Sequence, residues 1–590
     1  MFSRLSPLFP YLRRYWTSYV WGGLALIGYN LSKVLIPLLI GDATSDIQQG
    51  LSAAKLEHHA LRLLAVAVVS AVFLYLSRQI LIGASREIEF DLRNDLFSHL
   101  EAQSQEFFQR HRTGDIMARS TNDLNAVRQL LGPAIMYSAN TLVFTAAALP
   151  FMLRISHRLT LFAFLPLPFA SVLVQYFGAR IHRRFERIQA MFSDISAQAE
   201  ENFSGARLIR AFAQEEAQIA AFESSNREYI RRSLLLARLM AMLWPMLEFV
   251  LGVSLMITLL VGGREVVQHR INVSQFISYN IFMVQLTWPM IAIGWVVNLV
   301  QRGAASVIRI DALMQEKPSI DDSLATASKP YTLNPKPSIS GHITFRNLTF
   351  AYPTGPEVLH NINLDIPAGS SLAIVGPTGS GKSTLVALIP RLYDAPSGEV
   401  LLDNRPLREY PLAGLRSAIG FVPQETFLFS TTIADNIAFG DKEPGQHSLL
   451  QIEAAASTAH IATEILEFPA QFHTVVGERG MTLSGGQKQR TAIARAVLRD
   501  PRILILDDAL ASVDTNTEDQ ILTGLRETMR GRTTILIAHR VSTARHADRI
   551  AVLVEGRIAE LGSHDELLAR NGYYADLFEK QSLEEELVNA

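Results

Sequence analysis

The sequence predicts a membrane domain of about six helices, fused to an α/β domain that carries a P-loop. Three observations support this fold class. Long apolar stretches fill the front of the chain, the segment GPTGSGKST (residues 376–384) matches the P-loop pattern, and strand-like runs alternate with helical ones behind residue 340. We therefore expect the membrane domain over residues 1–313, a linker over 314–340 and the α/β domain over 341–590.

Size and composition agree with this division and exclude several classes of protein. The chain has 590 residues, too many for one hydrophobic core. Hydrophobic residues make up 48% of it, and the mean hydropathy of +0.17 is high for a soluble protein. The net charge of −2 gives no indication of nucleic-acid binding. Because the chain has no cysteine, disulfides, cysteine-ligated zinc and thiol catalysis are excluded.

The membrane domain is predicted from apolar stretches that can cross ~30 Å of hydrocarbon as helices. They cover residues 18–40, 60–84, 131–154, 157–178, 238–262 and 273–299. Ahead of them, the basic N-terminus predicts an amphipathic surface helix and not a cleaved signal peptide. Two polar, periodic segments, 85–130 and 179–236, are expected to continue as helices outside the membrane.

Arginine placement predicts the orientation of the spans. Both polar segments and the N-terminus are rich in arginine, so the positive-inside rule puts them in the cytoplasm. Arg154 and Arg158, beside the predicted outer turn, are exceptions. An even number of spans places both termini on the cytoplasmic side, and with them the α/β domain.

The P-loop carries the strongest chemical signal. GPTGSGKST follows the apolar run SLAIVG and opens a helix, which is the context that the motif requires. Its glycines would let backbone N–H groups converge on phosphates, Lys382 would face the β- and γ-phosphates, and the Ser383 hydroxyl would bind Mg²⁺. The residues assigned to this nucleotide site are Gly376, Thr378, Gly379, Ser380, Gly381, Lys382, Ser383 and Thr384.

A second motif, RILILDD (residues 502–508), predicts a buried strand with Asp507 at its end. That carboxylate is placed to hold Mg²⁺ through water. Taken alone, a core strand that ends at a surface acid is the simpler interpretation.

The pentapeptide LSGGQ (residues 483–487) resembles the signature of ABC ATPases, and other positions of that family follow in the expected order. The resemblance assigns Tyr352 to adenine stacking, Gln424 to the Mg²⁺-contacting Q-loop and His539 to the γ-phosphate. The further assigned residues are Asp514 in the D-loop and Ser484, Gly485, Gly486 and Gln487 in the signature. VGERG (residues 476–480) resembles a short motif that precedes the signature in exporters.

The resemblance covers nearly the whole chain and points to an exporter half-transporter. Residues 107–123 resemble the first intracellular loop of bacterial multidrug exporters, and residues 288–306 resemble their sixth helix. The sequence is most similar to Mdl-type multidrug half-transporters, which usually form heterodimers. The family arrangement implies two chains in the cytoplasmic membrane that enclose two ATP molecules, each between one chain's P-loop and the other's LSGGQ. Coupling regions are then expected near Gly114–Ser120 and Gln214–Phe222.

One position departs from the family pattern. Active ABC ATPases carry glutamate after the strand-end aspartate, where its carboxylate polarises the attacking water, and here the residue is Asp508. The shorter side chain withdraws the carboxylate by roughly 1 Å, a misplacement that can lower the rate about 100-fold. We therefore expect a slow site in this chain and a partner chain with glutamate. A homodimer with two slow sites, or an introduced Glu-to-Asp change, is the alternative.

Polar residues inside the predicted spans mark candidates for the transport path, because ionisable groups there usually face a bundle interior or water. The candidates are Glu248, Asn280, Gln285 and Trp288. Glu248 would attract cationic, amphipathic substrates, or it would form a helix–helix hydrogen bond or pair with Lys33.

The preferred function is ATP-driven export of hydrophobic or amphipathic compounds. A flippase for lipids or lipid-linked molecules has much the same sequence, and a non-transporting, ATP-switched regulator is a third hypothesis that Asp508 supports weakly. The membrane spans exclude a soluble ABC ATPase of DNA repair or translation. Importers usually keep their membrane domains on separate chains, which argues against an importer.

Overall fold

The computed structural model describes residues 2–50, 52–327, 339–353, 355–440, 445–477, 480, 482–510 and 515–589. The chain divides into two compact units, which are described separately. Unit 1 comprises Met1–Glu101 and Thr113–Glu316, and unit 2 comprises Ala102–Arg112 and Lys317–Ala590. Part of the predicted linker, residues 328–338, lies outside the described residues; ahead of it lies the short helix α13 (Ser323–Ala327).

Unit 1 is helical throughout. Five helical segments in the described part of the chain are long and apolar enough to cross a membrane: Trp16–Gln48, Ala53–Glu101, Thr113–Ile155, Glu215–Val267 and Val273–Met314. Four of them are single helices, α2 (Trp16–Gln48), α3 (Ala53–Glu101), α11 (Glu215–Val267) and α12 (Val273–Met314). The segment Thr113–Ile155 joins α5 (Thr113–Ala118), α6 (Leu124–Gln129) and α7 (Ile135–Ile155) through two π-helical turns.

The fourth predicted span, 157–178, is not among these five. It is divided between α8 (His157–Phe164) and α9 (Leu167–Ser204). The break falls at Pro166, because proline lacks the N–H that an unbroken helix needs. Six spans therefore stay a prediction.

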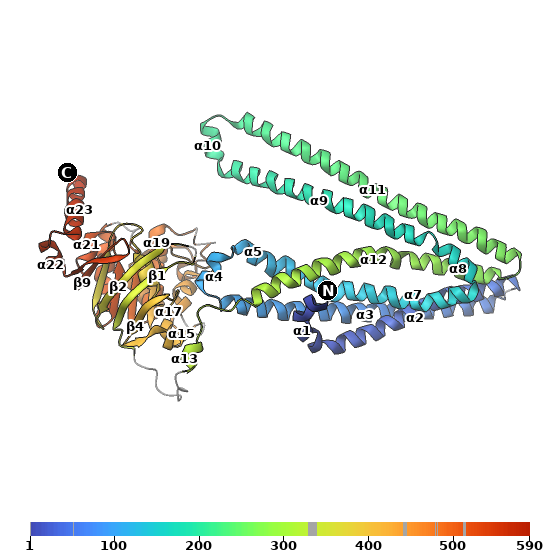
Figure 1. Cartoon of the computed structure of the whole chain (residues 1–590), viewed down its shortest axis with the longest axis horizontal. Helices are drawn as coiled ribbons and strands as arrows, with labels where there is room; N and C mark the ends of the chain where they lie inside the picture. Colours follow the sequence, from blue (N-terminus) through green and yellow to red (C-terminus); the bar gives the residue numbers. More distant parts are fainter. Residues whose placement is uncertain are drawn as a thin grey trace. The chain divides into compact units, whose positions relative to one another are not determined.

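The predicted cytoplasmic extensions are helical. α9 and α11 lie side by side and are joined at one end by the short helix α10 (Ala206–Ala211) (Figure 1). This end exposes a group of large apolar side chains, Phe203, Leu208, Phe212 and Ile219. The second expected coupling region, Gln214–Phe222, lies where α11 begins.

The segment ahead of the first expected coupling region belongs to unit 2. Gly114–Ser120 lies in unit 1, whereas the preceding segment Ala102–Arg112 packs within unit 2. Its helix α4 (Gln105–Arg110) contacts the α/β domain through Gln109, whose side-chain amide donates a hydrogen bond to the Tyr393 hydroxyl at 2.7 Å. The coupling role of Gly114–Ser120 stays a prediction.

Unit 2 contains two sheets. The smaller is antiparallel, in the order β2-β1-β4-β5, and the larger has the order β10-β9-β3-β8-β7-β6. The strands of the larger sheet are β3 (Ser371–Val375), β6 (Ile419–Val422), β7 (Ile503–Asp507), β8 (Thr533–Ile537), β9 (Arg549–Val554) and β10 (Arg557–Gly562). All its neighbouring pairs are parallel except β9–β10. The smaller sheet consists of β1 (Ile343–Ala351), β2 (Glu357–Ile366), β4 (Ser397–Leu402) and β5 (Arg405–Pro406).

The packing of strand β7 on both faces explains why its sequence is continuously apolar. Leu504 and Leu506 pack into a core with helices that include α19 (Gly485–Leu498), while Ile503 and Ile505 pack into a second core with residues of the smaller sheet. A strand covered on both faces has no solvent side, so the alternation of apolar and polar residues disappears.

Candidate functional site: a nucleotide-binding edge

The candidate site lies at one edge of the larger sheet. The parallel strands β3, β7 and β8 are neighbours, so their carboxyl ends meet there. β3 leads into the P-loop, β7 ends at Asp507, and β8 is followed by His539. The three segments enclose a cavity of about 190 Å³, lined by Val358, Thr378, Gly379, Gly381, Lys382, Ser383, Thr384, Gln424, Asp507, Asp508, Ile537 and His539.

The P-loop backbone requires glycine at two points. Gly376 has φ of +150°, and a Cβ there would lie 2.0 Å from the Leu553 carbonyl oxygen. Gly381, with φ of +97°, immediately precedes helix α14 (Lys382–Ala387), and its Cβ would lie 2.8 Å from the Leu359 side chain. Side chains at either position would displace backbone or buried neighbours, so the loop can adopt this shape only with glycine.

The loop also holds an unsatisfied polar group. The Ser380 side chain is buried, and its hydroxyl oxygen has no hydrogen-bond partner among the described residues. Lys382 donates from Nζ to the carbonyl oxygens of Gly376 and Pro377, at 2.9 Å each. Burial lowers the pKa of Lys382, although Asp508 and Asp507 raise it. An anionic ligand in the cavity would offer both groups a partner.

Ser383 and Asp507 supply oxygen atoms beside this lysine. The Ser383 hydroxyl donates to the Asp507 carboxylate at 2.8 Å. Burial raises the pKa of Asp507, and Asp508 raises it further, while the hydrogen bond from Ser383 lowers it. With the Gln424 side-chain amide on the same cavity, the site offers hydroxyl, carboxylate and amide oxygens, which are hard donors that fit Mg²⁺.

Asp508 lies between Gln424 and His539. Its carboxylate accepts a hydrogen bond from the Gln424 amide at 3.4 Å, and His539 Nε2 is 3.7 Å from its Oδ2. Burial raises the pKa of Asp508, while His539, Gln424 and Lys382 lower it. The three predicted catalytic residues are therefore brought together on one side of the cavity.

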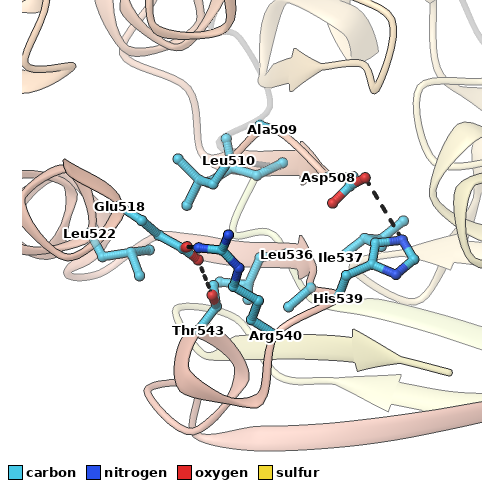
Figure 2. A pocket seen from close by; sticks show the side chains of 12 residues that line it. Asp508, Ala509, Leu510, Glu518, Leu522, Leu536, Ile537, His539, Arg540 and Thr543 are labelled. Atoms are coloured by element: carbon cyan, nitrogen blue, oxygen red, sulfur yellow. Dashed lines mark hydrogen bonds and ion pairs between the residues drawn. The ribbon is translucent and has the colours of Figure 1, made fainter. Parts of the chain in front are cut away.

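A second, smaller cavity of about 140 Å³ lies next to Asp508 and His539 (Figure 2). Glu518 of helix α20 (Thr515–Met529) points into it and accepts hydrogen bonds from the Arg540 guanidinium, at 2.6 Å, and from the Thr543 hydroxyl. None of these residues belongs to a motif, although Arg540 directly follows His539.

The predicted adenine-stacking residue, Tyr352, does not line the cavity of about 190 Å³. Its hydroxyl shares a hydrogen bond of 2.9 Å with the Thr384 hydroxyl, and its ring meets the Tyr393 ring edge-on at 5.4 Å between centroids. Tyr393 in turn accepts the hydrogen bond from Gln109. The nucleotide site is thus connected to helix α4, a contact for which the sequence gave no signal.

The signature residues lie elsewhere in unit 2 and do not line the described cavity. Ser484 is the N-cap of α19 and accepts from the Gln487 N–H, while the Gln487 side chain accepts from the Ser484 N–H. Gly485 and Gly486 form the first turn of α19. Asp514 lies outside the described residues.

The candidate transport residues differ in their surroundings. Glu248 is exposed on α11, and Trp288 on α12 is 60% exposed. Asn280 donates to the Phe276 carbonyl at 2.9 Å, and the buried Gln285 side-chain oxygen has no hydrogen-bond partner in the part of the chain that the structure describes. Lys33 does not pair with Glu248 among the described residues; its amino group lies 4.6 Å from the centre of the Phe144 ring.

Comparisons with known proteins agree with this geometry. Residues 20–290 match the family model described as ABC transporter transmembrane region, and residues 359–511 match the model described as ABC transporter. The multidrug resistance-like ATP-binding protein MdlA of Escherichia coli is 36% identical, over 100% of this chain and 98% of its own length. The probable multidrug resistance ABC transporter YheI of Bacillus subtilis is 34% identical, over 99% of this chain and 98% of its own.

Two further relatives extend the comparison. An ATP-dependent lipid A-core flippase of Syntrophus aciditrophicus is 34% identical over 94% of this chain and 90% of its own. The structure of a bacterial Atm1-family ABC exporter with ATP bound matches with a TM-score of 0.75 and 28% identity, over 97% of this chain and 98% of its own. With both regions matched on one polypeptide, the chain belongs to the ABC transporter family as an exporter whose transmembrane and ATP-binding domains are fused.

Proposed function

We propose that this chain is one half of a heterodimeric exporter of hydrophobic or amphipathic compounds in a bacterial cytoplasmic membrane. Its own ATP site would be slow, and its LSGGQ would complete a faster site on a partner chain. Asp508 carries the proposal, because its carboxylate stands where a glutamate would reach about 1 Å further toward the water that attacks ATP. The cytoplasmic side is proposed for unit 2 from the arginine distribution.

Two observations support the need for a second chain. Ser484–Gln487 do not line the described cavity, so the family's shared site needs the signature of another chain. In addition, four apolar side chains around α10, Phe203, Leu208, Phe212 and Ile219, are between 63% and 80% exposed in a segment expected to lie outside the membrane. Several large apolar side chains exposed to water near one helix end favour a protein contact there.

The residues of the cavity suggest how ATP would be held. The P-loop N–H groups, Lys382 and the Ser380 hydroxyl would bind its phosphates, while Ser383, Asp507 and Gln424 would supply Mg²⁺ ligands. Mg²⁺ would neutralise charge on the β- and γ-phosphates. Asp508 would orient the attacking water, and His539 would face the γ-phosphate.

The proposal is tested by ATP hydrolysis with the purified chain in lipid, alone and with neighbouring half-transporters. We expect negligible hydrolysis by the chain alone and restored hydrolysis with a partner. Changing the partner's catalytic glutamate to glutamine should abolish the restored activity. Fast, drug-stimulated hydrolysis by the chain alone would instead establish a homodimer in which Asp508 is an adequate base.

A lipid flippase is the second candidate, because a relative described as a lipid A-core flippase is 34% identical over nearly the whole chain. Reconstituted vesicles separate the two functions. Export of a hydrophobic dye without movement of labelled lipid supports the first, and ATP-dependent lipid movement without dye export supports the second.

A further inference from the structure

The loop that carries His539 is held by a side chain from the C-terminal helix α23 (Tyr573–Asn589). The Gln581 amide bridges the backbone on both sides of Arg540. It donates from Nε2 to the His539 carbonyl oxygen at 2.8 Å, and its oxygen accepts from the Val541 N–H at 2.7 Å. One side chain therefore satisfies a backbone acceptor and a backbone donor next to the predicted catalytic histidine.

The position of Gln581 on α23 is itself fixed. Tyr574 is fully buried, its hydroxyl lies 2.8 Å from His564 Nδ1, and Phe578 packs edge-on against the His564 ring. Tyr574, Phe578 and Gln581 follow at intervals of four and three residues, so they share one face of the helix. The aromatic anchors thus present Gln581 to the loop.

The opposite side of the same loop is held by α20. Glu518 is 5% exposed and accepts from Arg540 at 2.6 Å and from the Thr543 hydroxyl (Figure 2). Glu518 and Gln581 together hold the segment from His539 to Thr543 through four hydrogen bonds. The imidazole position follows from the position of this backbone.

The position of this backbone matters because His539 is already at the limit of its interaction with Asp508. Its Nε2 lies 3.7 Å from the Asp508 carboxylate, beyond hydrogen-bond distance. A displacement of about 1 Å in a catalytic group can change the rate about 100-fold.

We propose that Gln581 is a positioning residue for His539, so that the docking of the C-terminal helix sets the rate of ATP hydrolysis at the site that this histidine serves. The proposal goes beyond the export function and does not depend on the identity of the partner or the transported compound. It also gives α23 a role in the reaction, which its charged, tail-like sequence does not indicate.

The test compares Gln581→Met with Lys580→Ala in the full chain in lipid. Methionine keeps the length and loses both hydrogen bonds, while Lys580 is the exposed neighbour. Each variant is made in the natural chain and in an Asp508→Glu background. We expect Gln581→Met to lower kcat about 10-fold relative to its parent, with the KM for ATP within about twofold because the P-loop is untouched. Lys580→Ala should keep parental kinetics.

Two further readouts separate positioning from general stabilisation. Hydrogen exchange at the Val541 amide should accelerate in Gln581→Met but not in Lys580→Ala, while exchange in the P-loop stays the same. Gln581→Glu can donate to the His539 carbonyl only when protonated, so its kcat relative to the parent should be higher at pH 6 than at pH 8.

The proposal is overturned if Gln581→Met retains the parental kcat, or if its KM for ATP and its melting temperature change in step with kcat. These outcomes differ from a failure of the slow-site hypothesis. If Asp508→Glu does not accelerate hydrolysis, that hypothesis is wrong, yet the ratio of Gln581→Met to its parent still decides the role of Gln581.

Discussion

Asp508 occupies a backbone conformation that restricts its replacement. Its φ is +51°, in the left-handed region, where aspartate is tolerated better than residues with longer side chains. Its carboxylate accepts from Gln424 and faces His539. The backbone and the contacts thus suit an aspartate, and the length of the side chain is the property that we expect to limit catalysis.

Restoring the family's glutamate tests that expectation. Asp508→Glu should raise ATP hydrolysis at this site by roughly 10- to 100-fold, because the longer side chain extends the carboxylate by about 1 Å toward the attacking water. Single-turnover hydrolysis with radiolabelled ATP measures the rate, and Asp508→Asn, which cannot act as a base, is the control. Equal rates for aspartate and glutamate would mean that side-chain length is not limiting.

The raised pKa of Asp508 predicts a pH-dependent change in stability. Because burial favours the protonated carboxyl in the folded state, the ionised form destabilises the nucleotide-free fold, and this penalty disappears as pH falls through the raised pKa. Asp508→Asn should therefore raise the melting temperature of the ATP-binding domain by a few degrees at pH 7.5 and by less near pH 5. An increase that is the same at both pH values would contradict the assignment.

Most residues of the candidate nucleotide cavity that we expect to act on ATP could be selected from the sequence. The P-loop and the buried strand placed Lys382, Ser383 and Asp507, the resemblance to ABC ATPases added Gln424, Asp508 and His539, and the structure puts all six on one cavity. Gln581 and Glu518 carry no motif, because their partners are backbone or lie far along the chain. Contacts of this kind depend on tertiary packing and cannot be derived from local spacing.

Among the elements, α19 connects the signature to the segment that follows the Q-loop glutamine. Arg495 donates from Nε to the Asn436 carbonyl at 2.7 Å and from a terminal nitrogen to the Phe427 carbonyl at 3.1 Å. Burial lowers the pKa of Arg495 to about 10. Asn436, fully buried, accepts from the Phe429 N–H at 2.8 Å and donates to the Phe429 carbonyl at 2.9 Å. The aromatic segment Phe427–Phe429 is therefore held by the buried Asn436 and the half-buried Arg495.

Removing the Asn436 amide should destabilise this element. Asn436→Ala leaves the Phe429 N–H without the Asn436 oxygen, while the Phe429 carbonyl still accepts from the Thr431 N–H at 2.8 Å, so we expect a loss of about 1–2 kcal/mol. Chemical or thermal unfolding of the full chain in detergent, followed through the ATP-binding domain, measures it. Asp435→Asn changes an exposed neighbour and should remain within about 0.5 kcal/mol of the parent. Similar stabilities for the two variants would contradict the role of Asn436.

Element boundaries in the membrane domain were harder to predict than element types. Hydropathy indicates where a helix can cross lipid, but it does not report interruptions. The break at Leu165–Pro166 and the π-helical turns Arg119–Asp123 and Leu130–Ala134 fall inside segments whose apolar pattern is continuous or helical. Proline gave a signal for the first, whereas π-helical turns arise from packing against neighbouring helices and leave no comparable mark.

At the scale of the whole molecule, a short segment from the middle of the membrane domain's sequence belongs to unit 2. Ala102–Arg112 lies in sequence between helices of unit 1, yet packs with unit 2. Its Gln109 bonds to Tyr393, and the Tyr393 ring packs against Tyr352, which is expected to stack on adenine. A movement of α3 or α5 would therefore reach the nucleotide site through covalent attachment and two side-chain contacts.

Tyr393→Phe tests this connection. The substitution keeps the ring that packs against Tyr352 and removes the hydroxyl that accepts from Gln109, so ATP binding and basal hydrolysis should stay within about twofold. Stimulation of hydrolysis by transported compounds should fall severalfold, because the conformational signal then loses its specific contact with α4. Hydrolysis with and without compound, by the assembled transporter in lipid, measures the ratio.

Gln109→Ala removes the donor of the same hydrogen bond and should reproduce the loss of stimulation. The double variant should lose no more stimulation than either single variant, because the two residues are partners in one interaction. Additive losses would mean that each residue acts through a different contact. Unchanged stimulation in both single variants would show that α4 transmits its movement by backbone packing alone, and the path through Tyr393 and Tyr352 would then be wrong.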